Sequence, residues 1–378
     1  MVNFGFVFYL LFATAFAQEV RRAIPVRPCF AGYEEDALFF AGKDVPATSS
    51  LAPLQLSGGY QEHRLALQKM WTFYEQRQFT PMHEWSHQEL PSRIPFPSVV
   101  CYFFGGPDIL NPLALFSDAT TYFLCGKESV GLITPPEQVS PEQLQTSLAN
   151  LREEMQTVLL FGYFITKEMR SQFNTGPFQG VLPLLLTFLS LAGNHIVSVD
   201  QLTLGGAPGL RIRFIAPSGV EKTLYYAQQD LSNGSCHSFL RWFQRFTPVV
   251  SYLKAASYLL HEEDFSRARD FLLQNSNAIL QDDSGIPFRY FDMLNWTLYL
   301  FGDYKGPIEL FRSKYQADLA AAYQTSLLAA PMNFGTGYQF QSGLAGGANL
   351  LLAVRKHFAP RAMPVDSSSH KRRKKKKR

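Results

Sequence analysis

Two histidines and a glutamate have the spacing of a zinc peptidase site. The segment His83-Glu84-Trp85-Ser86-His87 fits the pattern H-E-x-x-H. On a helix, histidines at this spacing bind one zinc ion from the same face, and the glutamate activates the metal-bound water. The pentad would therefore supply His83 and His87 as zinc ligands and Glu84 as the general base of a zinc-dependent hydrolase.

The residues around the pentad argue against this chemistry. Pro91 would end such a helix after about ten residues. The extended metzincin pattern is absent, because Leu90 stands in place of its glycine and Arg93 in place of its third histidine. A third ligand would have to come from farther along the chain, for example from Glu153 or Glu154. We therefore favour a structural role for the pentad and no cofactor, and keep zinc as the alternative.

A second candidate is the Gly105-Gly106-Pro107-Asp108 turn, which follows an apolar run typical of a strand. Glycines there allow the backbone to approach an anion at a helix N-terminus. However, a third glycine is missing, and no lysine, serine or threonine follows at the spacing of a phosphate-binding loop. Asp108 is more simply the cap of a short helix. Gly105, Gly106 and Asp108 thus remain candidate ligand-binding residues without a nucleotide signature.

A third candidate is the acidic segment "DDSGIPFRYFD", which contains Asp282, Asp283, Arg289 and Asp292. Paired carboxylates beside an arginine are suited to binding a sugar or to acid–base catalysis. Asp-Ser-Gly is also an ordinary turn sequence, and the segment lacks the spacing of a calcium loop. It supports, as a further alternative, a carbohydrate-binding or carbohydrate-active protein.

The chain ends in an unbroken run of positive charge. Its last eight residues are all basic: Lys371, Arg372, Arg373, Lys374, Lys375, Lys376, Lys377 and Arg378. These eight belong to the 35 lysines and arginines of the chain, and the remaining 27 are outnumbered by 31 acidic residues. Each basic residue near an anionic lipid surface contributes about 1 kcal/mol of attraction. The run predicts attachment to an anionic membrane or envelope polymer, and not specific nucleic-acid recognition.

The first 17 residues have the pattern of a signal peptide. Residues 4–16 are an uncharged, mostly apolar run that ends in Ala15-Phe16-Ala17, the small-x-small pattern of a cleavage site. The run is shorter than the roughly 20 residues of a membrane span. We expect cleavage near Ala17 and export to the periplasm, the cell surface or the medium. In an exported protein, Cys29, Cys101, Cys125 and Cys236 permit disulfides in any of three pairings, and free thiols are the other alternative.

The periodicity of apolar residues predicts the elements that must hold these candidates. It predicts a helix over 61–79, and a strand, turn, short helix and parallel strand over 97–128. A capped helix should begin at Ser140-Pro141 and run towards Asn174. A buried helix is expected over 177–192.

From residue 195 onwards the pattern favours strands, with a hairpin turn at 217–219 and helical segments only around 235–260 and 308–323. The expected fold is mixed α/β (α+β), with an N-terminal β-α-β-like portion, long central helices and an antiparallel-rich C-terminal sheet. We expect one globular domain over 18–364, leave open a division into two lobes near 195, and expect a disordered tail over 365–378.

Four segments together resemble a group of uncharacterised exported bacterial proteins. They are "FFGGPDILNPLALFSDATTYFLCGKESVG", "DDSGIPFRYFD", "MNFGTGYQF" and "NLLLAVRK", and the similarity covers most of residues 98–356. The group has no established activity, so the resemblance supplies no catalytic residues. It favours 105–108 and 282–292 as shared features and leaves the histidine pentad outside. The sequence therefore predicts a non-catalytic envelope-associated protein of unknown function, held near anionic surfaces by its tail.

Overall fold

The computed structural model describes residues 32–94, 97–161, 176–325, 332–340 and 348–357. The predicted signal peptide, Cys29 and the basic tail lie outside these ranges. No helix within them is both long and apolar enough to cross a membrane.

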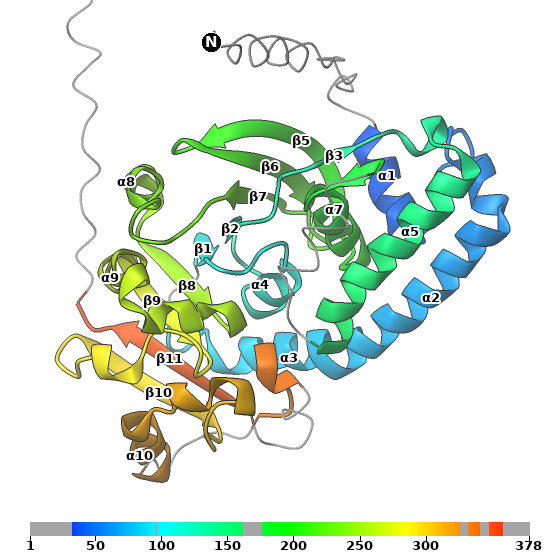
Figure 1. Ribbon diagram of the computed structural model, residues 1–378. Helices are drawn as coiled ribbons and strands as arrows, with labels where there is room; N and C mark the ends of the chain where they lie inside the picture. Colours follow the sequence, from blue (N-terminus) through cyan, green and yellow to red (C-terminus); the bar gives the residue numbers. More distant parts are fainter. Residues whose placement is uncertain (1–31, 95–96, 162–175, 326–331, 341–347, 358–378) are drawn as a thin grey trace, which may run out of the picture.

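The described residues form a nine-stranded sheet in the order β10-β11-β9-β8-β1-β2-β7-β6-β5 (Figure 1). The strands are β1 (Val99–Tyr102), β2 (Thr121–Gly126), β5 (His195–Leu204), β6 (Ala207–Ile215), β7 (Glu221–Gln228), β8 (Val249–Leu253), β9 (Ser276–Gln281), β10 (Trp296–Gly302) and β11 (Asn349–Arg355). A separate pair joins β3 (Leu132–Ile133) to β4 (Phe178–Gln179).

The middle of the sheet is parallel and its edges are antiparallel. β9, β8, β1, β2 and β7 run in the same direction. At one edge β11 and then β10 are added antiparallel, and at the other edge β6 and then β5. Strands that precede residue 195 in the chain, β1 and β2, therefore lie between strands that follow it.

Helices cover both faces of the sheet. Successive residues of a strand point to opposite sides, so each strand contributes to a buried cluster on each face. In β1, Val100 and Tyr102 belong to one buried cluster, while Cys101 belongs to the other. The first cluster takes in α1 (Gly32–Phe40), α2 (Gly58–Tyr74), α3 (Thr80–Glu89), α4 (Leu110–Leu115), α5 (Pro141–Gln156) and α7 (Leu182–Leu191). The second takes in α8 (His237–Phe243) and α9 (Ser266–Asn275), while α10 (Ala317–Thr325) packs near β10.

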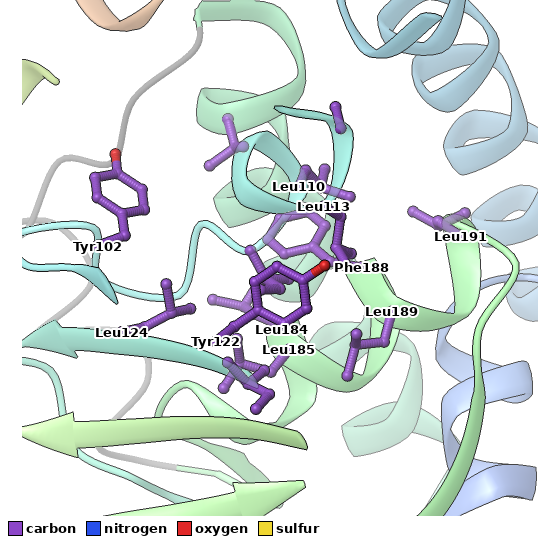
Figure 2. Packing of buried hydrophobic residues seen from close by; sticks show 14 of the residues in the cluster. Tyr102, Leu110, Leu113, Tyr122, Leu124, Leu184, Leu185, Phe188, Leu189 and Leu191 are labelled. Atoms are coloured by element: carbon purple, nitrogen blue, oxygen red, sulfur yellow. The ribbon is translucent and has the colours of Figure 1, made fainter. Parts of the chain in front are cut away.

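The hydrophobic helix expected over 177–192 is α7, and all its residues are buried. Figure 2 shows Leu184, Leu185 and Phe188 of this helix gathered with Tyr122 of β2 and with Leu110 of α4. A helix that is apolar on every side is stable in water only inside a core. The remaining helical turns are short: 3-10 turns at Ala52–Leu56, Pro136–Gln138, Gln244–Phe246, Ala255–His261, Glu263–Phe265, Phe288–Tyr290, Glu309–Lys314 and Gly337–Gln339, and π-helical turns at Glu75–Phe79 and Thr157–Phe161.

The connections between the parallel strands leave the centre of the sheet in opposite directions. From β1 the chain passes through α4 on one face to β2, while from β8 it passes through α9 on the other face to β9. β1 and β8 are neighbours, so the strand order reverses between them. In open α/β sheets, ligands bind beyond the carboxyl ends of the strands at such a switch point.

The mixed α/β class is confirmed, as is the parallel β1–α4–β2 unit. The cap of α5 is also confirmed, since the Ser140 hydroxyl accepts a hydrogen bond from the Gln143 amide at 3.3 Å. The prediction of helical segments around 235–260 is wrong in part, because it includes the central strand β8. The C-terminal strands are also less antiparallel than predicted, since β7, β8 and β9 run parallel to β1 and β2. A short apolar run such as "VVSYL", buried along its whole length, has no periodicity that separates strand from helix.

Candidate functional site

A cavity of about 110 Å³ lies at the switch point, beyond the carboxyl ends of β1, β2, β7 and β8. The turn after β1 borders it with Phe104, Gly105, Gly106 and Asp108, and Glu128 follows β2. Leu231, Leu259 and Phe265 add apolar surface. The cavity is partly open to solvent, and its mixture of apolar walls with a few polar groups is typical of a small-molecule site.

The two glycines of the turn allow other groups to approach closely. A methyl group on Gly105 would lie 2.5 Å from the Tyr102 ring. Gly106 has a φ of +54°, and its N–H donates to the Cys125 carbonyl at 3.0 Å. Glycine is therefore required at both positions, at the first by space and at the second by its backbone conformation.

The backbone around the cavity is strained. Among the described residues, the two non-glycine residues with positive φ are Phe104 at 67° and Ala255 at 54°. Both border this cavity, one after β1 and the other after β8. Bulky residues rarely adopt this conformation, and such strain clusters at binding and active sites. The two strained residues, one after β1 and one after β8, thus indicate a binding site at the same switch point as the strand order does.

A buried ion pair joins the two strands of the switch point. The Lys254 ammonium lies 2.7 Å from an Asp108 carboxylate oxygen, and both side chains are almost fully buried. The same oxygen, Oδ2, accepts from the Asn111 amide at 2.7 Å. The expectation that Asp108 caps a helix is wrong: α4 begins at Leu110, and Ile109 precedes it without a side-chain cap. The Asp108 carboxylate pairs instead with Lys254, which follows β8, because a buried charge needs an opposite charge.

Glu128, at the end of β2, was missed by sequence reasoning. The residue is 6% exposed, and its Oε2 accepts from the Tyr226 hydroxyl at 3.3 Å. A methyl group on Gly126 would lie 2.1 Å from this oxygen, and one on Gly106 would lie 3.5 Å from it. The carboxylate is thus packed over two glycines. Its signal in the sequence is its position, 22 residues after Gly106, close to the spacing of about 20 residues at which nucleotide-binding sheets place a ribose-binding acid.

The other charge beside the cavity is also paired. The Lys127 ammonium lies 2.8 Å from the Asp230 carboxylate. Asp230 follows β7, and Lys127, which borders the cavity, follows β2. Asp108, Glu128 and Lys127 therefore border the cavity, and Lys254 and Asp230 pair with two of them.

The histidine pentad lies elsewhere, on α3. The Nε2 atoms of His83 and His87 are 3.2 Å apart, and the Ser117 hydroxyl is 3.1 Å from that of His87. Burial first, and then the neighbouring His87, lowers the pKa of His83. Glu84 is exposed. Within the described part of the chain, no third histidine, cysteine, aspartate or glutamate joins the pair to form a metal-binding group, so Glu153 and Glu154 do not complete this site.

The predicted acidic cluster is divided by the fold. Asp282 and Asp283 follow β9, and both are buried. Asp282 accepts from the Ser284 amide at 3.0 Å and from the Thr336 hydroxyl at 3.1 Å. Asp283 accepts from the Tyr258 hydroxyl at 2.6 Å and from the amides of Gln339 and Asn349. These bonds tie β9 to distant segments and are those of a structural network.

Arg289 and Asp292 do not join this network. Arg289 is exposed, and its guanidinium lies 5.0 Å from the centre of the Tyr290 ring. Asp292 is exposed and accepts from the Asn295 side chain at 3.0 Å and from the Leu294 amide at 3.1 Å. The structure therefore brings together two of the four residues predicted from this segment.

The three cysteines within the described ranges, Cys101, Cys125 and Cys236, are buried free thiols. Burial raises the pKa of Cys101 to about 12 and that of Cys125 well above its usual value. Cys125 borders the cavity. A thiol held in its protonated form is a poor nucleophile, so this residue contributes surface and not reactivity.

No protein-family model matches the sequence. A comparison with curated proteins also finds no match.

Proposed function

We propose that this protein binds a nucleoside-containing small molecule in the cavity at the switch point. The observation that carries the proposal is Glu128, a buried carboxylate at the end of β2 that is packed over Gly106 of the turn after β1. Carboxylates in this position of a nucleotide-binding sheet accept hydrogen bonds from ribose hydroxyls.

The order of the strands supports the same ligand. The parallel strands β1, β2, β7, β8 and β9 can be numbered 1 to 5 along the chain. Their order across the sheet is then 3-2-1-4-5. This is the order of the doubly wound sheets that bind nucleotides at the reversal between their first and fourth strands. Because folds of this kind also host other functions, the proposal depends on the residues of the cavity and not on topology alone.

The walls of the cavity suit the two halves of a nucleoside. Phe104, Leu231, Leu259 and Phe265 offer apolar surface for a base, while Glu128 offers acceptors for a sugar diol. A nucleoside would fill the cavity and extend through its open side.

Titration of the purified chain with adenosine, followed by calorimetry, tests the proposal. We expect saturable binding, and we expect Glu128→Gln to weaken it roughly tenfold or more, since hydrogen bonds to a charged acceptor contribute about 1.5–3 kcal/mol. Glu142→Gln, at an exposed position of α5, is the matched control and should bind as the unaltered chain does. Absence of binding with adenosine, guanosine, cytidine and uridine alike would refute the proposal.

The basic tail favours a second, separate function as an electrostatic tether for an exported chain. Eight adjacent positive charges should attract vesicles that contain phosphatidylserine by about 1 kcal/mol for each charge near the surface. We expect co-sedimentation at low salt, and its loss near 1 M salt, where the screening length falls to about 3 Å. Replacing residues 371–378 with eight serines should abolish it. Equal binding of this variant would place the membrane contact elsewhere.

A further inference from the structure

This inference rests on the proposed function and concerns the kind of nucleoside. We infer that the ligand carries positive charge at its sugar end and no phosphate group there. Three features of the cavity support this: the hydrogen bonds of its glycine turn, the balance of its charges, and one oxygen of Asp108.

The amides of the turn are already occupied. Phosphate sites after a first strand use free backbone N–H groups and the start of a following helix. Here the Gly106 amide donates to Cys125, the Asp108 amide to the Gly105 carbonyl at 3.1 Å and the Ile109 amide to the Pro107 carbonyl at 2.8 Å. Pro107 has no N–H, and α4 is only six residues long. The turn therefore presents few donors to an anion.

The charges beside the cavity also disfavour a phosphate. Both ammonium groups, those of Lys254 and Lys127, are held by carboxylates at 2.7 and 2.8 Å. Glu128 adds a further carboxylate at the cavity wall. A phosphate bound there would face a net negative surface, while a cation would be attracted to it.

One oxygen of Asp108 is left to bind such a cation. Its Oδ2 holds Lys254 and Asn111, but its Oδ1 is buried and has no hydrogen-bond partner among the described residues. The residue as a whole is 1% exposed and borders the cavity. Leaving a buried carboxylate oxygen unpaired is costly, so a donor from the ligand would complete the site. An ammonium group on the sugar side of the ligand has the required charge and hydrogens.

The ligand class that combines these features is a nucleoside with a cationic substituent on its 5′ carbon. Sulfonium nucleosides that carry an amino acid, such as S-adenosylmethionine, belong to it. Nucleoside phosphates and dinucleotides do not.

Three compounds that differ only at the 5′ position test the inference on the unaltered chain. They are adenosine, 5′-amino-5′-deoxyadenosine, which is cationic, and adenosine 5′-monophosphate, which is anionic. We expect the amine to bind roughly tenfold more tightly than adenosine, and the monophosphate roughly tenfold or more weakly. Added salt should reduce the difference. S-adenosylmethionine should likewise bind more tightly than S-adenosylhomocysteine, which lacks the sulfonium charge.

The outcomes separate the two proposals. If none of the three compounds binds, and guanosine, cytidine and uridine do not bind either, the proposed function itself fails. If all bind but the monophosphate binds as well as or better than the amine, only the inference about charge is overturned. In Asp108→Asn the advantage of the amine over adenosine should disappear, and a preserved advantage would exclude Asp108 as its partner. The comparison of ligands on the unaltered chain stands whether or not this variant folds.

Discussion

Replacing Lys254 with methionine is expected to lower the free energy of unfolding by about 3–5 kcal/mol. The substitution keeps the length of the side chain but leaves the Asp108 carboxylate as an uncompensated charge, buried with 2% of its side chain exposed. Its hydrogen bond with Asn111 remains but cannot replace an opposite charge. Urea unfolding, followed by circular dichroism, measures the change.

The double variant Lys254→Met/Asp108→Leu shows whether the loss comes from the unpaired charge. Removing both charges should restore much of the stability, because a buried ion pair often adds little over apolar residues of similar volume. Lys314→Met is the control, since Lys314 pairs with a half-exposed Glu262 and an ion pair near the surface contributes about 0–1 kcal/mol. A loss no greater for Lys254→Met than for this control would refute the prediction.

The second large effect is a dependence of stability on pH that originates at Asp282. Burial first, and then the charge of Asp283, raises the pKa of Asp282 from 3.8 to about 7. Between these values the folded chain keeps a proton that the unfolded chain has released. The free energy of unfolding therefore falls as pH rises through this interval, by at most about 1.4 kcal/mol for each pH unit from this group. The contribution is fully present below the lower value and is lost above the higher one.

Asp282→Asn should weaken this dependence and raise the thermal unfolding temperature above pH 7, and the rest of the dependence should come from Asp283, whose pKa burial also raises. The amide oxygen can still accept from the amide and the hydroxyl of Ser284, and its NH₂ group can donate to the Thr336 hydroxyl. Asp292→Asn serves as the control: hydrogen bonds from Asn295 lower the pKa of this exposed carboxyl, so its removal should not flatten the curve between pH 4 and 7. Parallel curves for Asp282→Asn and the unaltered chain would show that another group is responsible.

The sequence alone determined the elements whose signals are local. The serine and proline at the start of α5, the glycine-containing hairpin between β6 and β7, and the uncharged helix α7 are each specified by neighbouring residues. The β1–α4–β2 unit was predicted because two apolar runs are separated by a glycine turn and one short helix. The predicted signal peptide and basic tail are also local patterns, and they stay predictions.

Only the tertiary structure decided which residues share a site. Asp108 and Lys254 are 146 positions apart in the sequence, and they meet because β1 and β8 pair in the sheet. No local pattern carries that pairing, since strand order is a property of long-range contacts. The sequence also singled out His83, His87 and Asp292, which lie apart from the cavity, whereas the predicted Gly105, Gly106 and Asp108 border it. Two further charged residues of the site, Glu128 and Lys254, look like ordinary charged residues until the parallel strands bring their carboxyl ends to one edge.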